Sequence, residues 1–350
     1  MKKVYLRERD RDILNLIVES YLKEGKPISS GYIAQKKAFP VSPATIRNIM
    51  SKLENLGYLL QPHTSAGRIP TDKGLRFYVN SLLEEALIPE QQVKLPAGDF
   101  YLERGDLNSL LSHVSKVLAE FSNNLGFVLS PRISKINFHH LRFIKISEQK
   151  VMIILITSSN LVITEIAETS TYFTQVELDK ASDYINTRFR GKNLLFVREY
   201  LLQELPYYKM KYESITHKLI ALLKAYIYQE ESESRIFLQG TSKLLEKPEL
   251  FDMERLKLLF QRFEEKAKLA KLLSDFIALD KVKVLIGSEL NIADISDCSL
   301  ILSHYGDHSQ VLGSLGIIGP KRIPYKKIIP LVDSVARKLS QTIVSVSKEG

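Results

Sequence analysis

The chain of 350 residues has little of what disulfide-linked, exported or membrane proteins need. Cys298 is its single cysteine, so no intramolecular disulfide can form, and we expect a reducing compartment. No apolar run follows the lysines at the amino terminus, so we expect no signal peptide. No stretch approaches the roughly 18 uncharged apolar residues of a membrane helix. We therefore expect a cytoplasmic protein that has no membrane partner.

Sequence motifs of catalysis and cofactor binding are also missing. Gly313, Gly316 and Gly319 do not have the spacing of a dinucleotide-binding loop, and a proline rather than a helix follows them. The chain has no phosphate-binding glycine–lysine loop, no nucleophile elbow and no paired-carboxylate motif. We expect no catalytic residue, no cofactor and no enzyme activity.

One group of potential metal ligands has to be weighed separately. Cys298, His304, Asp307 and His308 lie within eleven residues, but a glycine–aspartate turn interrupts them. The two histidines therefore do not share a helix face, as paired zinc ligands would. We expect loop and surface histidines and no metal site. A metal-dependent enzyme built on residues 298–308 is the alternative, and metal analysis of the purified protein would distinguish it.

What the chain does have is positive charge, and this charge is concentrated near the amino terminus. The net charge is +9, and between residues 26 and 76 eight lysines and arginines face only two acidic residues. Such a density of cations is typical of a nucleic-acid-binding module. A solvated basic face without a partner is the alternative, and the charge alone does not decide between the two.

The first 57 residues carry three helical patterns that are separated by stop signals. Apolar residues between 9 and 23 recur on one stripe, and Gly25 and Pro27 end this helix. A serine pair can cap a short second helix. Ser42, with a proline behind it, provides the N-cap of a third helix, which Gly57 ends.

The third helix carries a polar face opposite its apolar stripe. Small residues on this face allow a close approach to a DNA groove, while asparagine and arginine can read adenine and guanine. Helix, short helix, third helix and hairpin is the order of a winged helix-turn-helix, in which the third helix enters the major groove. The residues expected at the DNA from this helix are Ser42, Ala44, Thr45, Arg47, Asn48, Ser51 and Lys52.

The stretch from Gln61 to Gly74 is a run of turn formers between short apolar pieces. Leu59-Leu60 and Arg68-Ile69 are interpreted as the arms of a small hairpin, and Gly67 is expected to be free to adopt a positive φ. An ordinary polar loop is the alternative, but the place of this stretch after the third helix favours the wing of the module. The wing residues expected at the DNA are His63, Thr64, Ser65, Gly67 and Arg68.

The same motifs carry a family resemblance. Residues 42–79, from Ser-Pro-Ala-Thr-Ile-Arg-Asn through His-Thr-Ser-Ala-Gly-Arg-Ile-Pro-Thr-Asp-Lys-Gly, resemble the bacterial heat-inducible transcription repressor HrcA family. Further similar pieces stand at 237–245, 287–290, 298–301 and 319–325. The likeness covers essentially the whole chain. It implies an α+β multidomain protein: an N-terminal winged helix-turn-helix, then a GAF-like α+β domain with an inserted helical dimerising domain.

Beyond the basic module, we expect strands, then helices, then strands again. Three β-branched runs between 138 and 166 predict an antiparallel meander. A near-heptad run at 253–279 fits a coiled-coil seam between subunits, or ordinary core packing. The predicted ranges are a DNA-binding domain at 1–85, a linker at 86–104, GAF-like parts at 105–205 and 281–350, and an inserted dimerising region at 206–280.

The resemblance also implies a function. Members of this family repress chaperone operons such as grpE-dnaK-dnaJ and groES-groEL, and they bind an inverted-repeat operator called CIRCE at the nucleoid. The chaperonin GroEL helps to keep them active. A lone winged helix reads few base pairs, so a homodimer on double-stranded DNA is expected on geometric grounds as well. The alternative is a regulator whose GAF-like domain senses a small ligand, which a thermal-shift screen with metabolites would distinguish.

Overall fold

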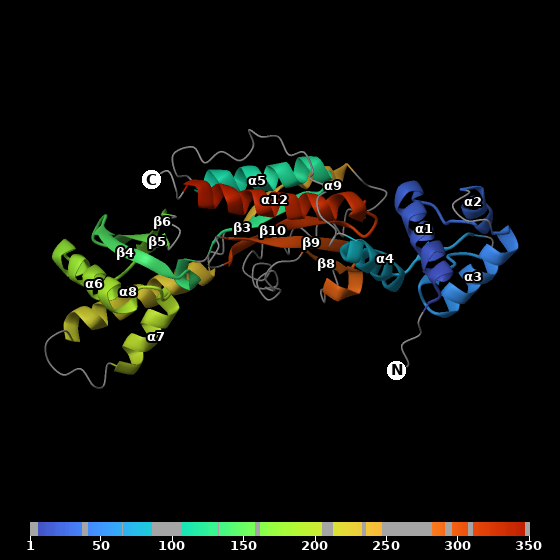
Figure 1. Ribbon diagram of the computed structural model, residues 1–350. Helices are drawn as coiled ribbons and strands as arrows, with labels where there is room; N and C mark the ends of the chain where they lie inside the picture. Colours follow the sequence, from blue (N-terminus) through green and yellow to red (C-terminus); the bar gives the residue numbers. More distant parts are fainter. Residues whose placement is uncertain are drawn as a thin grey trace.

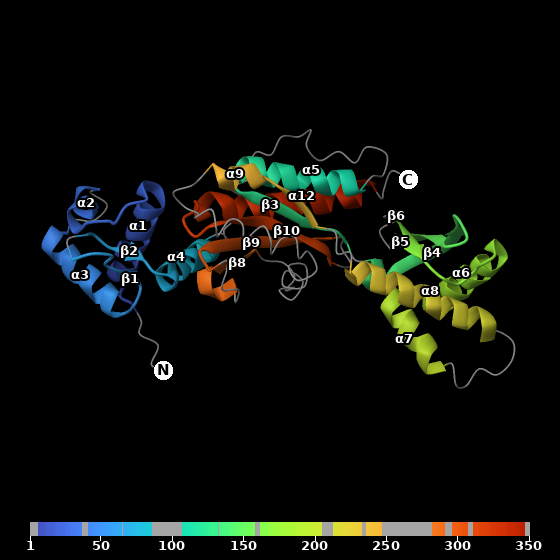
Figure 2. The same cartoon turned by 180° about the vertical axis from the view of Figure 1, so that it is seen from behind.

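The computed structural model describes eleven segments of the chain, which form three bodies in a row (Figure 1). An N-terminal module lies at one end, a central sheet with its helices in the middle, and a smaller sheet with its own helices at the other end (Figures 1 and 2). The described residues are 6–36, 41–64, 66–85, 107–131, 133–157, 162–204, 213–232, 236–246, 282–290, 296–306 and 311–346.

The N-terminal module has its elements in the predicted order. They are α1 (Glu8–Glu24), α2 (Ser30–Gln35), α3 (Pro43–Asn55), β1 (Leu59–Leu60), β2 (Ile69–Pro70) and α4 (Asp72–Glu85). The predicted stop signal after α1 is confirmed: Gly25 has a φ of 69° and donates its N–H to the carbonyl of Tyr21. β1 and β2 pair antiparallel, with Leu60 opposite Ile69.

The apolar stripes of α1, α3 and α4 form the core of this module. α1 contacts both α3 and α4, and each helix contributes side chains that are almost completely buried. These are Ile13, Leu14, Ile17 and Val18 from α1, Ile46, Met50 and Leu53 from α3, and Leu75 and Val79 from α4. The helical spacing of these residues is the reason that one face of each helix remains for solvent or a partner.

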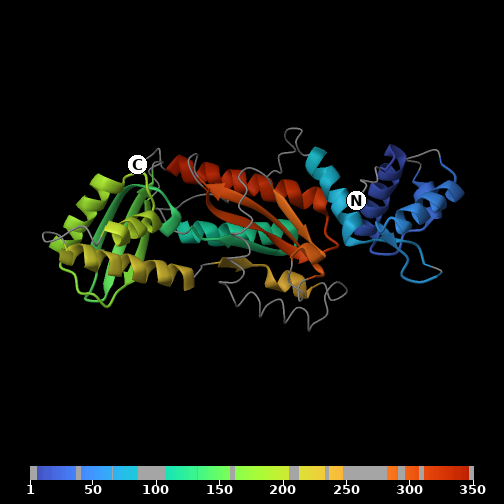
Figure 3. The ribbon, with the colours of Figure 1, turned by 90° about the horizontal axis from the view of Figure 1, so that it is seen from below.

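The central body is a five-stranded antiparallel sheet in the order β7-β3-β10-β9-β8. Two long helices, α5 (Leu107–Ser122) and α12 (Tyr325–Val346), contact each other and cover one face of it (Figures 1 and 3). The short α9 (Thr241–Leu245) and the 3-10 helix η4 (Gly287–Leu290) lie at its margins. The strands are β3 (Leu125–Leu129), β7 (Ile236–Gln239), β8 (Lys283–Ile286), β9 (Cys298–Gly306) and β10 (Val311–Pro320).

The third body contains a three-stranded antiparallel sheet in the order β4-β5-β6, which confirms the predicted meander. Its α6 packs on β4, and its α8 packs on β6. A 3-10 turn, η3 (Ile133–Lys135), leads into this body. Its elements are β4 (Phe138–Lys145), β5 (Lys150–Thr157), β6 (Val162–Glu168), α6 (Gln175–Phe189), α7 (Leu194–Glu204) and α8 (Glu213–Ser232).

The strands group differently from the ranges that the sequence suggested. The meander does not join the central sheet, although it falls in the range 105–205 that was expected to form one body with it. β7 does join the central sheet, next to β3, although it falls in the expected insertion at 206–280. Periodicity is a local signal, and the pairing of β3 with β7 spans about a hundred residues, which is why the pattern did not reveal it.

Two predicted segments lie outside the described residues: the linker at 86–104 and the near-heptad helix at 253–279. Within the described ranges, no helix combines the length and the apolar character that a membrane crossing requires.

Candidate nucleic-acid interface

The start of α3 is fixed by the residues that the sequence singled out as its cap. The Ser42 hydroxyl accepts a hydrogen bond from the backbone N–H of Thr45 at 3.2 Å, and the two hydroxyl oxygens lie 2.9 Å apart. Pro43 occupies the first helical position, where no N–H is needed. The two hydroxyls therefore orient the first turn of α3, and Ser42 remains exposed.

The outward face of α3 is exposed as predicted. Ala44, Arg47 and Asn48 are exposed and Ser51 is half-buried, whereas the intervening apolar residues are covered. α3 lies on the side of the module remote from the central sheet (Figures 1 and 2). This face is thus open to a partner as large as a DNA duplex, and its amide and guanidinium groups can reach base edges.

Lys52, which was expected to contact DNA, forms an ion pair within the module. Its Nζ lies 2.5 Å from Oδ2 of Asp10 on α1. The Asp10 side chain is 7% exposed and that of Lys52 is 46% exposed. Because a buried carboxylate needs a partner, Lys52 joins α3 to α1, and its ammonium is not directed outward.

Arg68 also turns back toward α3. Its Nε donates to Oε2 of Glu54 at 2.9 Å, and both side chains are largely covered. The backbone of Arg68 exchanges two hydrogen bonds with Ile28, of 2.8 and 2.9 Å. Arg68 therefore fixes the hairpin against α3 and against the segment before α2.

Gln61 organises the hairpin tip, a role that the sequence pattern did not suggest. Its side-chain Nε2 donates to the carbonyl oxygens of Thr64, at 2.9 Å, and Ala66, at 3.0 Å. The Ala66 N–H donates to the carbonyl of His63 at 2.8 Å. The sequence does contain a signal for this role, because an amide side chain beside a run of turn formers can donate hydrogen bonds to the turn carbonyls. His63 and Thr64 are exposed at this tip, and Ser65 lies outside the described residues.

Gly67 is needed for a different reason from the predicted one. It does not adopt a positive φ. A Cβ at this position would lie 2.4 Å from the backbone carbon and oxygen of Ile28. The close approach that allows the Ile28–Arg68 bridge therefore requires glycine, and the expected left-handed conformation was wrong.

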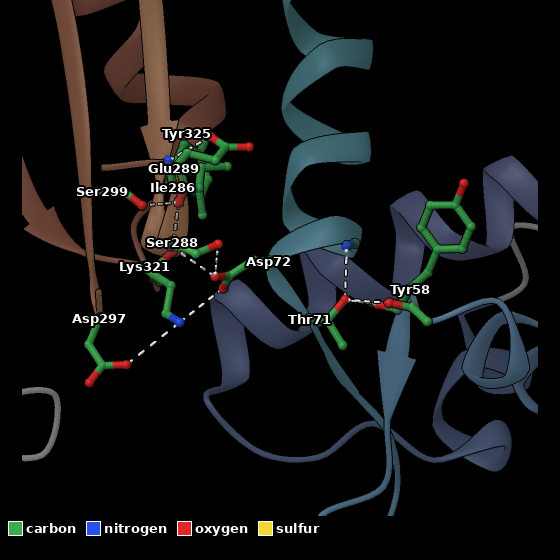
Figure 4. A network of polar contacts seen from close by, with 12 residues as sticks. Tyr58, Thr71, Asp72, Ile286, Ser288, Glu289, Asp297, Ser299, Lys321 and Tyr325 are labelled. Carbon is green, nitrogen blue, oxygen red and sulfur yellow. Dashed lines mark hydrogen bonds and ion pairs between the residues drawn. The ribbon is translucent and has the colours of Figure 1, made fainter. Parts of the chain in front are cut away.

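The exit of the hairpin is tied to the end of α3. The Thr71 hydroxyl donates to the carbonyl of Gly57 at 2.7 Å and accepts from the N–H of Gly74 at 3.2 Å, which caps α4 (Figure 4). The Lys73 ammonium donates to the carbonyl of Leu56 at 2.7 Å and lies 4.4 Å from the centre of the Tyr58 ring. The hairpin and α4 thus leave α3 in a fixed direction.

The metal-site alternative has no support in the described part of the chain. Cys298 and His304 lie on the same strand, six residues and therefore roughly 20 Å apart, too far for a common ion. Burial raises the pKa of the Cys298 thiol to about 12, and Nδ1 of His304 lies 2.8 Å from the Ser314 hydroxyl. Asp307 and His308 are outside the described residues, and among those described no three His, Cys, Asp or Glu side chains gather as metal ligands.

Comparisons with known proteins place nearly the whole chain in one family. The family model described as "HrcA protein C terminal domain" matches residues 108–329. A "Heat-inducible transcription repressor HrcA" of Geobacter sulfurreducens is 34% identical over 339 residues, covering 97% of this chain and 98% of that protein. The protein of the same name in Syntrophobacter fumaroxidans is 33% identical, covering 97% of both.

One solved crystal structure shares the fold. Described only as a hypothetical protein, it aligns with a TM-score of 0.63 at 24% sequence identity. The alignment covers 97% of this chain and 99% of that one, so the arrangement of all three bodies falls within the compared region.

Proposed function

The chain belongs to the HrcA family of heat-inducible transcription repressors, and from this premise we propose that its N-terminal module is a winged helix-turn-helix that binds the inverted-repeat operator CIRCE. As a heat-shock transcription repressor it acts on DNA in the cytoplasm, at the nucleoid. In this proposal α3 enters the major groove and the hairpin tip follows the DNA backbone. The observation that carries the proposal is the exposed face of α3, which holds Arg47 and Asn48 beside Ala44 at the outer end of the molecule.

The ion pairs of the module agree with this role and reduce the number of cations that are available to contact DNA. Lys52 and Arg68 are both paired with carboxylates, so Arg47 supplies the cation of the exposed α3 face. Phosphate contacts give affinity and salt dependence, whereas base contacts give specificity. We assign base reading to Asn48 and Arg47, and we assign backbone contacts to the Ser42–Thr45 turn and to His63 and Thr64 at the tip.

We further propose that the chain acts as a homodimer through the three-stranded sheet. One face of this sheet packs on α6 and α8, and the opposite face carries three cross-strand rows in which six of the nine side chains are apolar and none is buried. Val162 is 52% exposed and Ile166 43% exposed. Contiguous exposed apolar side chains of this kind are typical of protein interfaces. The outward-facing residues are His140, Arg142, Ile144, Met152, Ile154, Ile156, Val162, Thr164 and Ile166.

The domain assignment rests on the pairing of the larger strands into two separate sheets. We propose that the central sheet with α5 and α12 is the GAF-like domain and that the third body is the inserted dimerising domain. A two-fold axis through the face of the second sheet would relate the two N-terminal modules, as an inverted repeat requires. The chaperonin GroEL is the proposed partner that maintains repression, and exposed apolar side chains outside the dimer face, such as Phe196 and Leu202 of α7, are a surface that a chaperonin can bind.

A mobility-shift titration tests the proposed function. Purified full-length chain is titrated against a CIRCE duplex and a scrambled duplex at one salt concentration, with and without GroEL. We expect a specific shift with two chains per duplex, and tighter binding when GroEL is present. Equal affinity for the two duplexes would contradict operator recognition. If GroEL has no effect on binding, only the proposed GroEL partnership is contradicted.

A further inference from the structure

The first turn of α4 docks on the central body through Asp72 (Figure 4). Its carboxylate accepts hydrogen bonds from the backbone N–H of Ser288, at 3.2 Å, and from the Ser288 hydroxyl, at 3.4 Å. The Lys321 ammonium lies 2.9 Å from the other carboxylate oxygen and 3.6 Å from Asp297. One side chain of the N-terminal module thus joins η4 to the end of β10.

Arg76, one turn later on α4, makes the second connection. Its Nε donates to Oε1 of Glu289 at 2.7 Å, and a terminal nitrogen donates to Oε2 of Glu289 and to the carbonyl of Val284, the latter at 2.7 Å. The Glu289 carboxylate also accepts from the N–H of Ile286 at 2.9 Å, which fixes it to β8. A bidentate pair with a fixed carboxylate constrains direction as well as distance. We call Asp72, Arg76, Ser288, Glu289 and Lys321 the latch.

The backbone is shaped to receive these side chains. Gly287 has a φ of 57°, and a Cβ there would lie 2.2 Å from Oδ2 of Asp72. The Arg322 guanidinium fills the space that a side chain at Gly25 would occupy, so the C-terminal end of α1 also faces the central body. A cation at the end of a helix is favourable because the last carbonyls carry partial negative charge. The module therefore contacts the central body at two points, through α4 and through the end of α1.

We propose that Asp72 and Arg76 are positioning residues: the latch fixes the N-terminal module on the central body, so that a dimer presents its two α3 helices at the separation of the two operator half-sites. The inference rests on the proposed function. The latch lies on the opposite side of the module from the exposed α3 face, so its residues act on DNA binding through orientation (Figures 1 and 2). A fixed pair of modules engages its second half-site at a high effective concentration, whereas loose modules lose this advantage.

The variant Glu289→Gln distinguishes an effect of module orientation on DNA affinity from an effect of charge. Removing an acid strengthens DNA binding if only electrostatics matter, because the repulsion of phosphates falls. The proposal predicts the reverse for an inverted repeat: affinity falls by about tenfold or more, while affinity for a single half-site stays within about twofold. Arg76→Ala is expected to give the same pattern from the other side of the latch. The matched control is Glu120→Gln, which changes the same charge at an exposed ion pair on α5.

The experiment measures two properties of the full chain. Hydrogen exchange without DNA follows the backbone N–H groups of Ser288 and Ile286, which donate to the latch carboxylates, and we expect faster exchange in Glu289→Gln and Arg76→Ala. Fluorescence anisotropy then gives the affinities for an inverted-repeat duplex and a half-site duplex. Loss on the inverted repeat alone supports the proposal. Unchanged affinities, or equal loss on both duplexes, overturn it. If the parent chain binds neither duplex, the proposed function itself is wrong. The hydrogen-exchange data then show separately whether the latch forms.

Discussion

The ammonium of Lys52 lies 2.5 Å from the carboxylate of Asp10, so a lysine of α3 that was expected at the DNA instead holds α3 against α1. Asp10 is 5% exposed, and among the described residues Lys52 is the cation that pairs with it. The basic character of the module therefore has two parts. Some cations neutralise carboxylates inside the module, and others remain on its outer face.

The first prediction concerns Lys52→Ala. Removing the ammonium leaves a buried acceptor without its charged partner, which typically costs about 1–3 kcal/mol. We expect the free energy of unfolding, measured by urea denaturation, to fall by that amount. Arg47→Ala, at an exposed cation of the same helix, should leave stability within about 0.5 kcal/mol. If the Lys52 variant unfolds like the parent, but the salt slope of its DNA binding falls by about one unit, then Lys52 contacts DNA and the stabilising role is contradicted.

A second prediction separates the two possible roles of Arg68. If its pairing with Glu54 positions the hairpin, Arg68→Ala and Glu54→Gln both weaken operator binding, and the double variant is no weaker than the worse single one. If Arg68 binds phosphate directly, Glu54→Gln releases the guanidinium and strengthens binding. Anisotropy titrations of the three variants decide between these outcomes, and tighter binding by Glu54→Gln would contradict the positioning role.

The third prediction tests the proposed dimer face. Ile166 is 43% exposed and stands directly opposite Met152 on the outward side of the second sheet. Ile166→Lys places a charge within the proposed interface, where burying it without a partner is costly. We expect monomers by light scattering at concentrations where the parent is dimeric. Val176→Lys, at a 63% exposed position on α6, is the matched control and should not change the mass. A dimeric Ile166 variant would place the interface elsewhere.

The fourth prediction is a pH dependence in the third body. Glu177 caps α6 together with Thr174, and Lys218 of α8 lies 2.6 Å from its carboxylate. The Lys218 hydrogen bond, with those of Thr174, lowers the pKa of Glu177 from 4.5 to about 2. A lowered pKa in the folded state means that the charged form stabilises the fold. This contribution is full above pH 4.5 and is lost as the pH falls toward 2.

Glu177→Gln should therefore be less stable than the parent at neutral pH, by about 1 kcal/mol for a lost capping interaction. The difference should shrink when unfolding is measured between pH 4.5 and pH 3. Glu148→Gln, at an exposed carboxylate that pairs with Lys145, is the control and should show a smaller effect. A difference between parent and Glu177→Gln that does not change with pH would contradict this assignment.

Local signals in the sequence predicted the helix ends and the strands, although not the φ of Gly67. Ser42 followed by a proline predicted the start of α3, and Gly25 predicted the end of α1, because caps and left-handed stops depend on a few adjacent residues. The three strands of the meander were predicted for the same reason, since alternating and β-branched runs mark each of them. The exposed α3 face followed directly from the helical spacing.

Long-range contacts could not be predicted in this way. Lys52 and Asp10 are 42 residues apart, and no pattern along α3 indicates which way a long side chain turns. Asp72 and Lys321 are 249 residues apart, so the segments at 287–290 and 319–325 were recognisable as motifs but not as a docking surface. The same holds for β7, whose place beside β3 depends on the fold of the whole chain.

One measurement decides whether the exposed face of α3 reads the operator. It compares the parent with Asn48→Ala on a CIRCE duplex and a scrambled duplex, by anisotropy at one salt concentration. We expect the parent to bind CIRCE about 10³-fold or more tightly than the scrambled duplex. Asn48→Ala should lose about 1–3 kcal/mol on CIRCE, the typical value of a bidentate base contact, and nothing on the scrambled duplex. An Asn48→Ala chain that binds both duplexes like the parent would contradict the claim that the exposed face of α3 reads the operator.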